Sequence, residues 1–143
     1  MFRHSKTLVA LVVMLFGGVA GCGSRPSYEF APVEGKVTLN GKPLVGVIVK
    51  FYPNNDGMTQ LPVAMGTTDE TGTYQLSISK EQPGALVGPN IAVVHWPHRD
   101  RDKPPPVPDA PIPLKYTDLK ESPLRFEVKA GSGQTFDLTL TND

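Results

Sequence analysis

The sequence predicts an all-β domain, an antiparallel β-sandwich, behind a short N-terminal leader. Two observations carry this prediction. Apolar and polar residues alternate with a period of two in short segments between residue 33 and residue 141, and turn-forming residues separate these segments. No stretch after residue 21 shows a convincing helical period. Regular short strands with one solvent-exposed and one buried face are typical of antiparallel sandwiches.

We expect seven strands, at residues 33–39, 47–51, 62–67, 74–78, 91–96, 124–128 and 136–140. In the first strand, Val33, Val37 and Leu39 fall on one face and charged or polar residues on the other. Asn40-Gly41 follows as a tight turn, because both residues tolerate a positive φ. The last two strands repeat the alternation in the same form, so each strand is predicted to bury one face.

The first 21 residues have the layout of a signal peptide, and we expect them to form a signal helix that is cleaved off. Arg3 and Lys6 give a basic start, residues 8–16 are an unbroken apolar run, and small residues follow. This run is shorter than the roughly 20 residues that a membrane-spanning helix needs. Val19-Ala20-Gly21-Cys22 resembles the lipobox of bacterial lipoproteins. An uncleaved membrane anchor is the alternative.

That resemblance implies cleavage between Gly21 and Cys22 and a covalent lipid on the new N-terminus. The Cys22 sulfur would carry diacylglycerol and its amine a fatty acyl chain such as palmitate. Several chains bind a membrane firmly, because each buried methylene contributes about 0.8 kcal/mol. Cys22 is the single cysteine, so no intramolecular disulfide can form. Gly23 at the next position favours the outer membrane over the inner one, with the domain facing the periplasm or the exterior.

Residues 22–32 are predicted to be a tether and residues 33–143 one domain. As a flexible coil the tether would span roughly 17 Å, which keeps the domain near the lipid. Fourteen basic and fourteen acidic residues balance in the whole chain, and removing Arg3 and Lys6 leaves 12 − 14 = −2. A net charge of −2 does not provide the positive potential that attracts nucleic acid, so we expect no nucleic-acid partner.

Residues 97–118 are the segment that does not fit a strand, since six of the ten residues from Pro104 to Pro113 are proline. An exposed loop of this length is often functional. It is the candidate site for a partner or a small ligand. The candidate contact residues are Arg99, Arg101, Lys103, Pro104 and Tyr116.

His95 and His98 are the candidate metal ligands, with Asp100 and Asp102 following. On an extended chain their spacing turns the two imidazoles to opposite sides. A catalytic metal would also want three protein ligands. The sequence therefore predicts no metal site and no cofactor other than the lipid on Cys22. It contains no H-E-x-x-H, P-loop, G-x-G-x-x-G or G-x-S-x-G motif, so no catalytic residue is assigned.

The order of several turn-and-strand motifs resembles carboxypeptidase regulatory-like domains. The motifs begin with Val33-x-Gly35-x-Val37-x-Leu39-Asn40-Gly41 and continue through Thr68-Asp69-x-x-Gly72-x-Tyr74 to Ile112-Pro113-x-Lys115-Tyr116. The resemblance implies a Greek-key, transthyretin-like sandwich. In carboxypeptidases this domain is an accessory, so it implies a fold and not an activity. The C-terminal tetrapeptide of transthyretin-like hydrolases is missing.

From the sequence we expect a membrane-anchored, non-catalytic lipoprotein that acts as a structural or protein-binding module of the cell envelope. Two alternatives stay open. One is a module that binds a small ligand or carbohydrate through residues 97–118. The more distant one is a transthyretin-like hydrolase.

Overall fold

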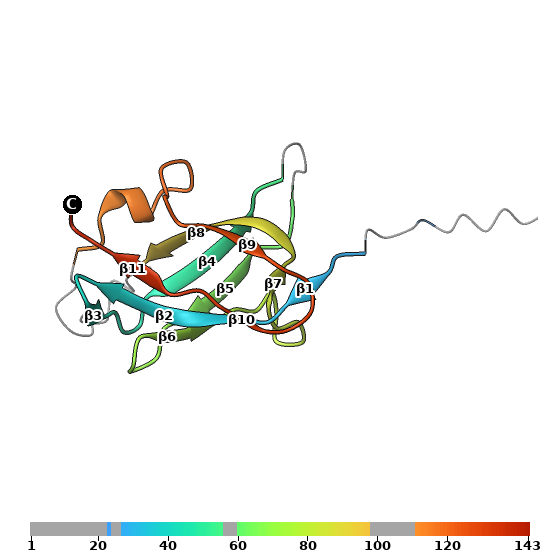
Figure 1. The fold of residues 1–143 in the computed structure, drawn as a ribbon, viewed down its shortest axis with the longest axis horizontal. Coiled ribbons are helices and arrows are strands. Elements are labelled where there is room, and N and C mark those ends of the chain that lie inside the picture. The colour runs from blue at the N-terminus through green and yellow to red at the C-terminus, as the bar shows by residue number, and fades with distance from the viewer. Residues whose placement is uncertain (1–22, 24–26, 56–59, 98–110) are drawn as a thin grey trace, which may run out of the picture.

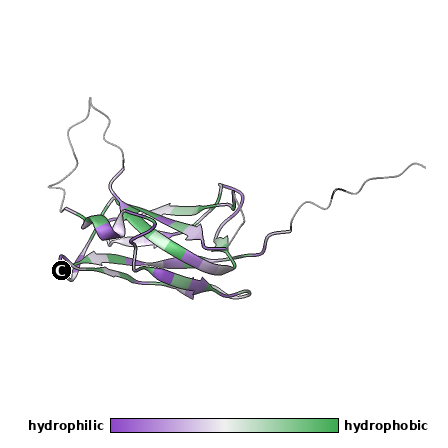
Figure 2. Ribbon diagram, turned by 90° about the horizontal axis from the view of Figure 1, so that it is seen from above, coloured by the Kyte–Doolittle hydropathy of each residue, from purple (hydrophilic) through white to green (hydrophobic). Residues whose placement is uncertain are grey.

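The computed structural model describes residue 23 and residues 27–55, 60–97 and 111–143 (Figure 1). In these ranges the chain forms eleven strands and one short 3₁₀ helix, η1, at Leu114–Tyr116. Nine of the strands build two facing sheets, which a view at a right angle shows as two layers (Figure 2), and the other two form a short ribbon. The predicted all-β sandwich is therefore confirmed. The predicted signal helix lies outside the described residues.

The first sheet is centred on β2 (Val33–Leu39), and we call it the β2 sheet. Strands β3 (Lys42–Pro43) and β6 (Thr73–Gln75) pair with β2 in the antiparallel direction. Strands β10 (Gln134–Thr135) and β11 (Leu138–Leu140) pair with β2 in the parallel direction. Glu34 pairs with both Gln75 and Thr135, so β6 and β10 flank β2 on its two sides.

The second sheet, which we call the β4 sheet, has the order β5-β4-β8-β9 and is antiparallel throughout. Its strands are β5 (Ala64–Thr67), β4 (Ile48–Pro53), β8 (Gly88–His95) and β9 (Arg125–Val128). A two-stranded antiparallel ribbon joins β1 (Phe30–Ala31) to β7 (Ala85–Leu86).

Each of the seven predicted strand segments contains a strand, but two details of the prediction need correction. Four short strands, β1, β3, β7 and β10, add to the seven. The pairings of β2 with β10 and β11 are parallel, not antiparallel. Alternation assigns a side chain to a face, but it carries no information on which strand lies beside it or in which direction that strand runs.

The core lies between the two sheets and is built from the residues that the alternation placed inward. Phe51 of β4 is fully buried, and its ring lies 5.6 Å from that of Phe126, 6.2 Å from that of Phe136 and 6.5 Å from that of Tyr74. These rings come from both sheets. Such aromatic pairs add about 0.5–1.5 kcal/mol to the free energy gained from area burial, so this cluster joins the layers.

Gly35 allows the closest backbone approach inside the β2 sheet. A Cβ atom at this position would lie 2.0 Å from the carbonyl oxygen of Phe136 and 2.9 Å from the hydroxyl of Tyr74. The Tyr74 hydroxyl donates a hydrogen bond of 2.5 Å to that same carbonyl. Burial raises the pKa of Tyr74 well above its usual range, and the charge of Asp137 adds to this. The phenol therefore stays protonated and keeps donating.

The two ends of the domain carry different features (Figure 1). Strand β1 and the N-terminal approach lie at one end, whereas η1 and the C-terminus lie at the other. Ala31 is fully buried and pairs with Ala85, although residues 22–32 were predicted to be tether. The folded part thus begins before residue 33, because β7 offers a strand edge that the sequence does not reveal.

In the described part of the chain, no helix combines the length and the apolarity needed to cross a bilayer.

Candidate functional site

The end of the domain opposite β1 holds the described part of the predicted interaction loop. Helix η1 packs against β8, and the Tyr116 side chain from η1 enters the core with 4 % of its surface exposed. Its hydroxyl accepts a hydrogen bond of 3.1 Å from the backbone N–H of Thr141. Tyr116 thereby ties η1 to the chain that follows β11, which belongs to the other sheet.

The Tyr116 phenol has a lowered pKa. Burial is the largest influence and acts to raise it, but hydrogen bonds from the side chain and backbone of Thr141 and the charge of Lys115 together outweigh burial. The Lys115 ammonium lies 5.0 Å from the centre of the Tyr116 ring and donates a hydrogen bond of 2.6 Å to the carbonyl of Asp143. Tyr116 was predicted to be a contact residue, but its side chain is buried in the core and is not available at the surface.

Leu114, two residues earlier, has the opposite character. Its side chain is 80 % exposed, the largest value among the described large apolar residues. Leu119 is 40 % exposed in the turn that follows η1. Below this turn, the buried Ser122 donates to the carbonyl of Ala92 and accepts from the N–H of Leu124. The backbone at Leu114 is also fixed, because its carbonyl accepts hydrogen bonds from the N–H groups of Thr117 and Asp118.

His95 lies at the end of β8 and is partly buried. Its Nδ1 atom is 3.0 Å from the carbonyl oxygen of Trp96. The described residues contain no group of three or more His, Cys, Asp or Glu side chains that could hold a metal ion. His98, the other candidate ligand named from the sequence, lies outside the described residues.

Most of the other predicted site residues also lie outside the described residues. They are Gly21 and Cys22 at the cleavage site, and Arg99, Arg101, Lys103 and Pro104 in the interaction loop.

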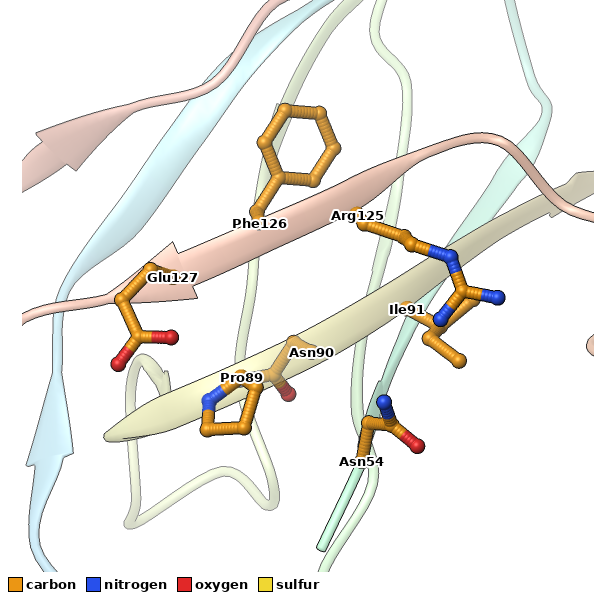
Figure 3. Close-up of a pocket in the computed structure, with 7 residues that line it drawn as sticks. All are labelled: Asn54, Pro89, Asn90, Ile91, Arg125, Phe126 and Glu127. Carbon is orange, nitrogen blue, oxygen red and sulfur yellow. The ribbon is translucent and has the colours of Figure 1, made fainter.

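A second feature, on the outer face of the β4 sheet, was not predicted. A shallow hollow of about 270 Å³ lies over the first half of β8, over β9 and over Asn54, which follows β4 (Figure 3). The side chains around it are those of Asn54, Pro89, Ile91, Arg125 and Glu127. The alternation in the sequence does place Arg125 and Glu127 together on one face. It does not reveal that β9 pairs with β8 next to Pro89 and Ile91.

Comparisons with known proteins give one informative similarity. No family model matches the chain, and no solved structure matches it. Transthyretin-like protein 5 from Caenorhabditis elegans is 32 % identical over 89 residues, which are 62 % of this chain and 61 % of that protein. The chain thus spans less than two thirds of the length of this relative. Together with the two-layered fold, the similarity supports a transthyretin-like domain in this chain.

Proposed function

We propose that this chain is a bacterial lipoprotein, anchored through Cys22, whose transthyretin-like domain is a non-catalytic, protein-binding module of the cell envelope. The proposal places the domain in the periplasm or at the exterior, with the outer membrane favoured. The observation that carries the binding role is the exposed side chain of Leu114 at the end of the domain opposite β1.

The short distance between Cys22 and the first strand supports the anchor. Strand β1 begins at Phe30, so residues 23–29 are the whole link to the folded part. Seven extended residues span at most about 24 Å. A lipid on Cys22 would therefore hold the β1 end close to the membrane, and η1 lies at the opposite end of the domain (Figure 1). An apolar side chain there meets partners from the aqueous side.

The chemistry of the η1 end supports protein binding. Leu114 offers an apolar contact, and Leu119 adds a second one nearby in the sequence. Lys115, Lys120 and Glu121 supply charges between and beside them. An apolar centre with a charged surround is the usual composition of a protein contact patch.

Three of the described polar side chains have structural tasks, which supports a non-catalytic role. Tyr116 and Tyr74 use their hydroxyls to fix backbone groups, and Asp69 uses its carboxylate to close a turn. A catalytic acid or base would need to reach a bound substrate. These groups are instead occupied within the fold.

Two measurements on cells test this proposal. First, wild-type protein should fractionate with membranes, and Cys22→Ala should be released or mislocalised. Second, a photo-cross-linking amino acid at Leu114 should join a defined envelope protein, whereas the same amino acid at Thr139, on the β2 sheet, should not. A Cys22→Ala protein that is still processed and still membrane-bound would overturn the anchor. Equal cross-linking from both positions would overturn the binding surface.

A further inference from the structure

The hollow on the β4 sheet is surrounded by residues of regular strands and by Asn54. The N–H of Asn54 donates a hydrogen bond of 2.8 Å to the carbonyl of Pro89, which joins the end of β4 to β8. Register pairs Pro89 with Glu127 and Ile91 with Arg125, so these four residues alternate across two neighbouring strands. Side chains on such elements are held more precisely than those on loops.

Residues on the inner side of the same strands hold the strands under the hollow in place. Asn90 is buried and donates hydrogen bonds of 2.9 Å and 3.0 Å to the carbonyls of Leu86 and Gly88. Phe126 stacks on Phe51 with an interplanar angle of 7°. The strands under the hollow are therefore anchored in the core.

The rim offers polar groups of complementary kinds. No hydrogen bond or ion pair engages the side chains of Asn54, Arg125 or Glu127 with another described residue, and all three are exposed. A guanidinium donates only, a carboxylate accepts only, and an amide does both. Between them, Pro89 and Ile91 give an apolar floor (Figure 3).

This arrangement selects the chemistry of a ligand. Arg125 and Glu127 cancel in charge, so the hollow does not favour a strongly anionic or cationic molecule. Hydroxyl groups both donate and accept, and they can therefore serve all three rim side chains. A ring with an apolar C–H face would cover Pro89 and Ile91. Pockets for drug-sized ligands have about 300–1,000 Å³, so a hollow of about 270 Å³ suits a small ligand.

We infer that the hollow framed by Asn54, Pro89, Ile91, Arg125 and Glu127 binds a sugar ring of an uncharged glycan. Arg125 donates to ring hydroxyls and Glu127 accepts from them, while Pro89 and Ile91 contact the apolar face of the ring. Tyr52 pairs with Ile91 and lies on the same outer face of the β4 sheet. This site lies on a different surface from Leu114, and it does not depend on the lipid anchor.

The test is a titration of the full chain, purified in detergent, with three uncharged disaccharides: N,N′-diacetylchitobiose, cellobiose and maltose. We expect saturable binding of at least one of them, detected by NMR shifts. Arg125→Gln and Glu127→Gln should each weaken it tenfold or more, since each removes a charged hydrogen-bonding partner. Lys42→Gln, an exposed charge change on β3, should leave it unchanged.

Three results would overturn the inference. They are the absence of saturable binding of all three disaccharides, unchanged affinity in both Arg125→Gln and Glu127→Gln, and binding of the zwitterionic dipeptide Gly-Leu in place of the sugars. Both substituted side chains are exposed, so the variants should fold, and equal thermal midpoints check this. Membrane fractionation and cross-linking at Leu114 are separate readouts, so failure here is distinguishable from failure of the proposed function.

Discussion

The outer faces of the two sheets differ in composition. On the β2 sheet this face is polar apart from Pro43, and its paired residues are Glu34, Lys36, Thr38, Thr73, Gln75, Thr135 and Thr139. On the β4 sheet more than half of the outer residues are apolar, namely Ile48, Tyr52, Met65, Pro89, Ile91 and Val93. Ile91 and Val93 are 8 % and 4 % exposed although they point away from the core.

This difference shows that the two sheets are stabilised in different ways. The β2 sheet is a solvated layer that depends on its inner face and on the close backbone approach at Gly35. The β4 sheet packs apolar side chains on both faces, and its outer face holds the hollow beside Arg125. A face that keeps apolar surface near solvent is more often a contact surface than a fully polar one is.

The largest expected effect comes from adding one methyl group inside the β2 sheet. Gly35→Ala would place a Cβ 2.0 Å from the Phe136 carbonyl oxygen, so β2 or the link between β10 and β11 has to move. We expect a loss of more than about 3 kcal/mol in the free energy of unfolding, because strain and the broken Tyr74 hydrogen bond add. Urea denaturation measures it.

Gly133→Ala is the matched control. Its Cβ would meet Pro32 at 3.7 Å, an ordinary contact, so we expect a change of less than about 1 kcal/mol. Similar losses in the two variants would show that the close approach at Gly35 is not what holds the β2 sheet.

A smaller effect should separate the two outer faces directly. Val93→Thr puts a hydroxyl into the packed outer face of the β4 sheet. It should lower the free energy of unfolding by about 1–3 kcal/mol, because the hydroxyl is removed from water without a hydrogen-bonding partner to replace it. Thr139→Val on the β2 sheet should change stability by no more than about 0.5 kcal/mol. Thermal and urea unfolding of both variants measure the contrast, and equal costs would remove the distinction between the faces.

The smallest effect concerns the turn through which the chain passes from the β4 sheet to the β2 sheet. The Asp69 carboxylate accepts hydrogen bonds from the side chain of Thr71, at 2.7 Å, and from the backbone of Thr71 and Thr73. These bonds hold the pKa of Asp69 below its usual 3.8, the Thr71 side chain contributing most. A carboxyl with a depressed pKa in the folded state stabilises the fold above its unfolded pKa.

The stability difference between wild type and Asp69→Ala should therefore be full at neutral pH and shrink as the pH falls below about 4. Asp69→Asn keeps an acceptor without the titrating charge, so its stability should not show this extra loss in acid. Urea unfolding at several pH values gives the curves. A constant difference between wild type and Asp69→Ala across the acid range would rule out the contribution of the charge.

Local pattern was sufficient for the inward residues of the sandwich. Val33, Val37 and Leu39 were predicted to share the inward face of their strand, and all three are buried. The pattern fails in residues 91–94, which are all buried, since a continuous apolar run has no alternation to read. The parallel pairing of β2 with β11 and the burial of Ala31 were also missed, because both depend on a partner strand far away in the sequence.

The candidate sites were harder to predict for the same reason. Tyr116 and Leu114 are both large apolar residues of one loop, and nothing local distinguishes the buried one from the exposed one. The hollow combines Arg125 with Pro89, and the β8–β9 register that joins them is a property of the folded chain.

The most direct test of the account is the intact mass of the protein extracted from membranes of the cells that make it. We predict a chain that starts at Cys22, lacks residues 1–21, and carries the added mass of a diacylglyceryl group with or without an N-acyl chain. Finding the unmodified 143-residue chain, or a chain cleaved elsewhere without lipid, would contradict the membrane-anchored lipoprotein.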